Sequence, residues 1–227
     1  MSGLGALKPS LRRLRLAYRL AADRSGVALI EFGFSLPILL VLCLTGAELT
    51  NYVITRMRVS QIALHLADNA ARIGSGSQLQ SKTITEADIN DLLTGAGLQA
   101  GELDLYPRGR VIVSSIVPKS DPNPSGHYVI NWQRCRGDQT GHASSYGNEG
   151  DMITKGMGRK DREAFAPPGG ATIFVEVYYQ YRPLVQIGLA PTTEMTEIAS
   201  MVVRDNRDNT GGNNGVYPVN GVAASTC

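Results

Sequence analysis

The apolar run from Val27 to Ala47 contains a single charged side chain, that of Glu31. At 1.5 Å per residue, a helix of this length measures about 32 Å, enough to cross the hydrocarbon core of a bilayer. A carboxylate inside such a segment costs roughly 2.5–3.5 kcal/mol, so chains avoid it unless it has a partner or a role. The run therefore predicts a membrane-spanning helix with one unusual acidic group near its start.

The residues that precede this run are mostly basic. Lysine and arginine side chains up to Gly26 outnumber the single acid Asp23: Lys8, Arg12, Arg13, Arg15, Arg19 and Arg24. A basic segment before an apolar run predicts a cytoplasmic N-terminus, with the rest of the chain across the membrane. A nucleic-acid-binding tail is the less favoured interpretation, because the basic residues stop where the apolar run starts. Segment 1–26 is either a short amphipathic helix on the inner membrane surface or a flexible charged tail.

The helical pattern continues beyond the apolar run. Apolar residues recur at steps of three and four through Glu48–Ile73, and no glycine or proline interrupts this segment. We therefore expect one helix over 27–73, apolar all round in its first half and amphipathic in its second. The glycines of Gly74–Gly76 are expected to end it. Glu48 is interpreted as a solvated glutamate near the outer membrane interface.

Residues 74–227 are expected to form an extracytoplasmic domain. A second helix is predicted at Glu86–Thr94, with Thr85 and Asp88 as its capping pair and Gly95–Gly97 closing it. Strands are predicted at Leu103–Tyr106, Arg110–Val117, His127–Cys135, Thr172–Arg182 and Thr196–Arg204, with Tyr128, Ile130 and Trp132 on one face. Helices that precede strands predict an α+β fold, in which the amphipathic half of the long helix packs on an antiparallel sheet of about four strands. The long loop 136–171 has no periodic pattern.

The cysteines and histidines suggest a bridge but no catalytic or metal site. Cys135 and Cys227 both lie outside the apolar run, where thiols oxidise, so a disulfide between them is expected to tether the tail. The polar tail 206–215 is otherwise expected to be mobile, and Asp205–Asn209 resembles a calcium loop only in composition. His65, His127 and His142 are scattered and no catalytic motif occurs. We therefore expect no metal, no cofactor and no enzymatic activity.

The start of the apolar run also resembles a known family. The sequence Arg24-Ser-Gly-Val-Ala-Leu-Ile-Glu-Phe32, the following Leu36-Pro37 and the later Gly46-Ala-Glu-Leu49 resemble the TadE-like minor pseudopilins of tight-adherence (Flp-type, type IV-like) pilus systems. A less specific likeness is Tyr181-Arg-Pro-Leu184. The resemblance is strong over about 25 N-terminal residues; over the extracytoplasmic domain it is one of pilin-like architecture alone.

The resemblance implies cleavage by a membrane prepilin peptidase between Gly26 and Val27. Val27 would become the new N-terminus, with an amine that the analogy implies to be methylated, and Glu31 would face the amine of a neighbouring subunit. Such a pair would favour correct register more than raw stability, because desolvation offsets much of the attraction. Phe32 stands where major Flp pilins have tyrosine, which together with the large extracytoplasmic domain favours a minor subunit.

We therefore expect a minor pseudopilin that takes part in assembling such a pilus. It would be held in the bacterial inner membrane by a single span, with its C-terminal domain in the periplasm or in a cell-surface filament. The implied partners are the prepilin peptidase, other pilins or pseudopilins of the system and the inner membrane, with neither nucleic acid nor a small-molecule substrate. Two alternatives stay open: an uncleaved, membrane-anchored periplasmic assembly factor, and a signal-anchored envelope protein that binds a ligand.

Overall fold

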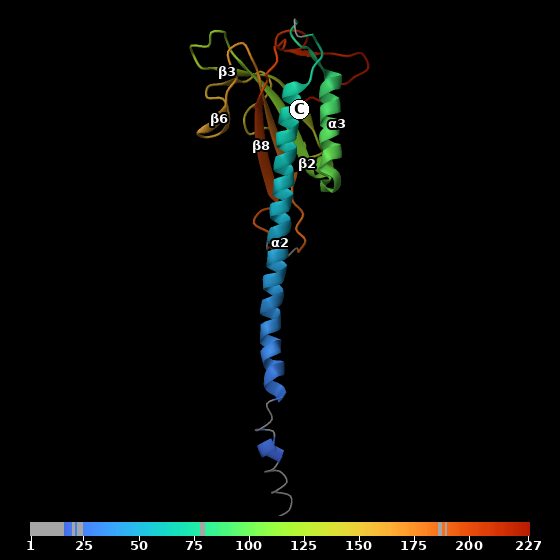
Figure 1. The fold of residues 1–227 in the computed structure, drawn as a ribbon, viewed down its shortest axis with the longest axis vertical. Helices are drawn as coiled ribbons and strands as arrows, with labels where there is room; N and C mark the ends of the chain where they lie inside the picture. Colours follow the sequence, from blue (N-terminus) through green and yellow to red (C-terminus); the bar gives the residue numbers. More distant parts are fainter. Residues whose placement is uncertain (1–15, 20, 22–24, 78–79, 186–187, 189) are drawn as a thin grey trace, which may run out of the picture. The chain divides into compact units, whose positions relative to one another are not determined.

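The computed structural model describes residues 16–19, 21, 25–77, 80–185, 188 and 190–227 (Figure 1). The chain divides into two compact units, Met1–Glu48 and Leu49–Cys227, and each is described by itself. Most of the expected leader, 1–26, lies outside the described residues.

The long helix α2 runs from Ser25 to Arg72. The prediction of one continuous helix is thus confirmed, with its ends displaced by one or two residues. Pro37 lies inside the helix and, because proline has no N–H, leaves one backbone hydrogen bond unmade. Within the described part of the chain, α2 is the one helix long and apolar enough to cross a membrane. By length and composition it is compatible with a single-pass anchor.

The second unit is built on a five-stranded sheet with the order β4-β3-β2-β7-β8, in which every neighbouring pair is antiparallel. Its strands are β2 (Gly109–Pro118), β3 (Tyr128–Arg136), β4 (Met152–Ile153), β7 (Thr172–Gln180) and β8 (Glu194–Val202). Two small sheets pair β1 (Ile84–Thr85) with β9 (Val216–Tyr217) and β5 (Met157–Arg159) with β6 (Arg162–Ala164). The α+β class is confirmed, and the main sheet has one strand more than the predicted four.

One face of the sheet is covered by α2 residues 49–72 and by helix α3 (Glu86–Ala100). The main core combines both helices with β2, β3 and β7 through Val59, Ile62, Leu66, Ile89, Leu93, Val111, Val113, Trp132, Ile173, Val175 and Val177. The contacting face of α2 is rich in small side chains, since Ala63, Ala67 and Ala70 are fully buried. Small residues allow the helix to approach the strands closely without voids.

The opposite face of the sheet is covered by the long loop that follows β3. Its residues Tyr146, Met157 and Ala164 pack against Phe174 and Ile116 in a second, smaller core. The segment 136–171 therefore has a structural role that its lack of periodicity did not reveal. It contains the short strands β4, β5 and β6, and it leaves β7 buried on both faces.

Helix α3 begins as predicted but ends later. Thr85 and Asp88 form the expected capping box, in which the Asp88 N–H donates to Thr85 Oγ1 at 3.2 Å and the Thr85 N–H to Asp88 Oδ2 at 2.9 Å. The glycines of Gly95–Gly97 do not end the helix, which continues to Ala100. A Cβ on Gly97 would lie 2.5 Å from the ring of Tyr106, so the glycine is needed for this close approach.

The predicted strand Leu103–Tyr106 is wrong. Residues Gly101–Leu103 form a 3₁₀ turn (η1) and Leu105–Arg108 a single helical turn (α4). Asp104 accounts for the difference, because its left-handed backbone (φ +50°) cannot be part of an extended strand.

Strand β3 carries a bulge that overturns another prediction. Ser115 lies opposite Trp132 but Ile116 lies opposite Ile130, so Asn131 is an extra residue. The bulge reverses the alternation of side chains. Trp132 packs in the main core and Ile130 in the smaller one, so these residues do not share one face.

The tail beyond β8 is held by specific contacts. The Asn131 side-chain amide donates to the carbonyls of Asn209 and Asn214 at 2.7 and 2.6 Å. Asp208 accepts from Tyr217 Oη at 2.6 Å and from the Gly211 N–H at 2.9 Å. The Tyr217 bond, followed by the backbone N–H groups, lowers the pKa of Asp208. The aspartate thus organises a turn within its own segment.

Arg207 binds the C-terminal end of α2. Its guanidinium donates to the carbonyls of Ala70, Ala71 and Ile73 at 3.2, 3.3 and 2.7 Å, and only 6% of the residue is exposed. Burial lowers its pKa, and the charge of Asp205 partly offsets this. The last carbonyls of a helix have no hydrogen-bond donor within it, so Arg207 supplies donors to the end of α2.

We predict that Arg207→Met lowers the free energy of unfolding by about 2–4 kcal/mol, because it leaves several buried carbonyls without donors. Denaturant unfolding can be followed by the fluorescence of Trp132, the chain's single tryptophan, which is 2% exposed. Arg204→Met is the matched control, because Arg204 is exposed and its loss should cost less than about 0.5 kcal/mol. Equal effects of the two substitutions would contradict the capping role.

Candidate functional site

The predicted processing segment, Gly26 to Phe32, lies in the first turns of α2. The peptide bond between Gly26 and Val27 is in the turn whose backbone N–H groups have no acceptor within the helix. The side chains of Val27 and Phe32 are 59% and 58% exposed, and Glu31 is exposed as well. The structure therefore places the bond predicted to be cut, the carboxylate and the aromatic ring on uncovered surface.

Glycine at position 26 is not required by the fold. A Cβ built there would meet no atom within 4 Å, and the same is true of Gly33. An alanine would favour the helix by about 1 kcal/mol relative to glycine. The packing of this chain therefore does not explain why residue 26 is glycine.

Val27 and Glu31 are four residues apart, and so lie on the same side of the helix. Within the described parts of the chain, Glu31 forms no ion pair. The exposed free thiol of Cys43 lies further along the same helix.

Glu48 is not the solvated residue that the sequence suggested, because none of its surface is exposed. It lies on the helix face that Tyr52, Thr55 and Val59 continue at steps of three and four residues, and all of these are buried. The helical period, applied one turn earlier, would have placed it correctly.

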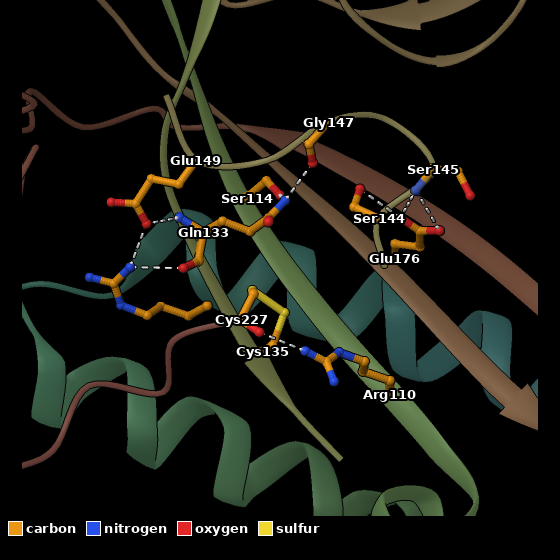
Figure 2. The surroundings of a disulfide bond; sticks show 11 residues. Arg110, Ser114, Gln133, Cys135, Ser144, Ser145, Gly147, Glu149, Glu176 and Cys227 are labelled. Atoms are coloured by element: carbon orange, nitrogen blue, oxygen red, sulfur yellow. Dashed lines mark hydrogen bonds and ion pairs between the residues drawn. A yellow bond between two sulfur atoms is a disulfide. The ribbon is translucent and has the colours of Figure 1, made fainter. Parts of the chain in front are cut away.

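The expected disulfide between Cys135 and Cys227 is present (Figure 2). Around it, the Cys135 N–H donates to the Ser225 carbonyl at 2.7 Å and Arg110 Nη2 to the Cys227 backbone oxygen at 3.1 Å. Ser225 Oγ also donates to Asn90 Oδ1 of α3 at 2.6 Å. The last residues are therefore fixed to both β3 and α3, as a tethered tail requires.

A buried ion-pair cluster lies beside the disulfide. Arg134 on β3 contacts Glu86 of α3 at 2.6 Å and Glu149 of the long loop at 2.9 Å. The side chains of Arg134 and Glu86 are both 4% exposed. Burial lowers the pKa of Arg134, but the hydrogen bonds and charges of Glu86 and Glu149 outweigh it and hold the pKa above its ordinary value. The cluster joins three segments that are distant in sequence.

A second buried carboxylate, Glu176 on β7, holds the part of the long loop that precedes Glu149. It is fully buried and accepts from Ser144 Oγ at 3.0 Å and from the Ser145 N–H at 3.3 Å, as Figure 2 shows. His142 Nε2 lies 3.3 Å from it, and the His142 ring stacks on Tyr178 with centroids 4.1 Å apart.

This cluster is not arranged as a hydrolytic triad. Ser144 donates to Glu176 itself, whereas a triad serine donates to the histidine. The sequence had shown only scattered histidines. The sequence did contain one signal of this cluster, which is Glu176 in the middle of the most regular strand. A carboxylate there requires hydrogen-bond partners once the strand is buried. Among the described residues, no three His, Cys, Asp or Glu side chains gather as metal ligands would.

Comparison with known proteins finds no relative of this chain. No family model, no curated protein and no solved structure matches it.

We predict that Cys135→Ala, alone or together with Cys227→Ala, lowers the free energy of unfolding by about 2–5 kcal/mol. The bridge closes a long loop, with a sequence separation of 92, and its loss frees the tail in the unfolded chain. Denaturation followed by Trp132 fluorescence measures the change. Cys43→Ala, which removes the free cysteine, should leave the transition unchanged. A single and double variant that unfold like the wild type would refute the role of the bridge.

We predict strong coupling between Glu86 and Arg134. Glu86→Leu alone should cost about 3 kcal/mol, because it leaves a buried guanidinium with Glu149 as its remaining charged partner. The double variant Glu86→Leu/Arg134→Met should recover most of that loss. A double-mutant cycle from denaturant unfolding gives the interaction energy, and simple additivity of the two substitutions would contradict the prediction.

Proposed function

We propose that this protein is a minor pseudopilin of a tight-adherence (Flp-type) pilus system, processed by a prepilin peptidase between Gly26 and Val27. The observation that carries the proposal is an uncovered apolar helix whose single early charge is Glu31 and whose first turn holds a glycine that the fold does not need. A glycine without a packing reason fits a narrow enzyme cleft, because it has no side chain to exclude.

The position of the bond suits cleavage. It lies where the basic leader gives way to the apolar run, within reach of an enzyme at the cytoplasmic face of the inner membrane. Extending the backbone around Gly26 disrupts only the start of α2, where few hydrogen bonds exist to be broken. The peptidase can therefore engage an extended segment without unfolding the rest of the helix.

Cleavage would leave a positive amine on Val27, and the Glu31 carboxylate of an adjacent subunit is its proposed partner. In the low dielectric of a bundle of apolar helices the two charges attract more strongly than in water, but desolvation offsets much of the gain. The pair therefore acts chiefly on the register between subunits. The exposed apolar side chains that surround it, such as Leu29, Phe34 and Leu39, would contact lipid before assembly and neighbouring helices afterwards.

The folded second unit would be presented outside the membrane, in the periplasm or on a filament. Its disulfide supports that location, because structural disulfides persist in oxidising compartments. The assembly role also fits the contacts of the buried Glu176 with His142, Ser144 and Ser145, which hold the long loop in place.

We predict that co-expression with an active prepilin peptidase shortens the wild-type chain by residues 1–26, as measured by intact mass. Gly26→Ala should abolish cleavage while leaving Trp132 fluorescence and helix content unchanged, because the added methyl meets no atom within 4 Å. Gly33→Ala is the matched control: it adds the same methyl to a glycine with equally open surroundings and should be cleaved normally.

A full-length mass in the presence of active peptidase would overturn the pseudopilin proposal and favour the uncleaved, membrane-anchored assembly factor. Cleavage of both glycine variants would show that the bond is not selected through Gly26.

A further inference from the structure

The two outer edges of the five-stranded sheet differ in how they are covered. On the β3 side, backbone groups find partners along the strand: Tyr128 and Val129 pair with β4, Ile130 bonds to Gly150 and Asp151, the Gln133 N–H to Glu149, and the Cys135 N–H to Ser225. Native sheets cover their edges in this way because unpaired strands template further pairing.

Strand β8 forms the opposite edge. The Tyr181 N–H donates to the Thr193 carbonyl at 2.8 Å and the Val203 N–H to the Ala171 carbonyl at 2.9 Å, so odd-numbered residues of β8 direct their backbone groups to β7. The outward N–H and C=O groups belong to the even-numbered residues Thr196, Ile198, Ser200 and Val202. Within the described part of the chain, these groups have no hydrogen-bond partner. At Glu194 the Thr192 hydroxyl binds both the N–H and the C=O.

Several of the usual protections of an edge strand are missing from β8. It has nine residues without proline or lysine, and its register with β7 is continuous from Glu194 to Val202. No bulge interrupts the open stretch, and the one charged side chain within it, Glu197, faces α2 and is paired with Arg56 at 2.7 Å. A strand of this kind is disposed to accept another strand.

Opposite charges mark the two ends of this edge. Glu194 begins β8 and Arg204 follows its end; both residues are exposed, and neither side chain forms an ion pair within the described residues. Arg204 also lines an open groove of about 330 Å³, whose apolar residues are Ala71, Met201 and Val202 and whose other lining residues are charged: Asp68, Arg72, Lys82 and Asp205. The groove therefore offers a small apolar surface beside the Arg204 guanidinium.

We propose that the outer edge of β8 docks an extended segment of another protein, which adds to the sheet as an antiparallel strand. Its backbone would pair with Thr196, Ile198, Ser200 and Val202. An acidic side chain near its N-terminal end would meet Arg204, with an apolar neighbour in the groove, and a basic side chain near its C-terminal end would meet Glu194. This site goes beyond the proposed function and does not depend on cleavage after Gly26.

A second copy of this chain is a poorer occupant. Antiparallel pairing of two β8 strands about a two-fold axis would run the two copies of α2 residues 49–72 in opposite directions. Chains anchored in one membrane through that helix cannot adopt this arrangement.

The test uses the full-length protein in detergent micelles and a fluorescently labelled nine-residue peptide. The peptide has glutamate at its N-terminal end, lysine at its C-terminal end and alternating valine and threonine between them. Fluorescence anisotropy should show saturable binding below about 1 mM. A peptide with the two charged residues exchanged should bind about fivefold more weakly or worse, because antiparallel docking then opposes like charges. A peptide N-methylated on the groups that face β8 should not bind.

Two sets of variants locate the site. Ser200→Pro removes one outward N–H and leaves the ladder to β7 intact, so peptide affinity should fall about tenfold, whereas the matched Ser200→Thr should bind normally. Glu194→Lys/Arg204→Glu should reverse the preference between the two charged peptides. This reversal of charge preference still tests the proposal if the Ser200→Pro variant does not fold.

Saturable binding that follows these preferences supports the proposal. Absence of binding by about 1 mM, equal binding of the N-methylated peptide, or a wild-type preference for the charge-exchanged peptide would overturn it. Self-association of the full-length protein that Ser200→Pro abolishes would also overturn it, by assigning the edge to a second copy.

Discussion

Strand β7 is buried on both faces, and covering it determines what the rest of the second unit must supply. One face requires a broad apolar surface, which α2 and α3 provide together through alanine, leucine and isoleucine side chains. The other face carries Glu176, and a fully buried carboxylate is tolerated only with hydrogen-bond donors. The long loop brings those donors from Ser144 and Ser145, along with apolar side chains for the smaller core. The loop is therefore a second layer of the fold: it covers Phe174 and supplies the donors that Glu176 needs once it is buried.

Contacts between distant parts of the chain fix the tail, α3 and the long loop to strand β3. Asn131, the extra residue of the β3 bulge, binds the tail through its amide. Arg134 draws α3 and the long loop to β3, and the disulfide fixes the last residues nearby. Each of these contacts links segments that regular helix and strand hydrogen bonds do not join. The pattern accounts for the order of the polar tail, whose composition alone suggests mobility.

The sequence predicted those features that depend on local pattern. The long helix, the capping box of Thr85 and Asp88, and the strands that became β2, β3, β7 and β8 all follow from periodicity and propensity. The disulfide was predicted because Cys135 and Cys227 are the two cysteines outside the apolar run, where thiols are expected to oxidise. The features that it missed depend on tertiary contacts. Gly97 looked like a helix end because the ring of Tyr106 that requires it comes from elsewhere. One unpaired residue in β3 exchanged the faces of Ile130 and Trp132, and Glu176 has no visible partner until the loop folds over it. The role of the segment from Gly26 to Phe32 stays a prediction, because no contact among the described residues explains its glycine.

The contact between Arg207 and the end of α2 has a consequence for the timing of folding. The guanidinium and the Ala70 carbonyl that it binds are 137 residues apart in the chain. If the chain is threaded across a membrane behind its anchor, α2 emerges long before the group that completes its last turn. Its final carbonyls must remain hydrated until nearly the whole domain has been exported. Completion of this helix end would therefore come late in export of the domain, and a chain interrupted before Arg207 would leave these carbonyls without their donor.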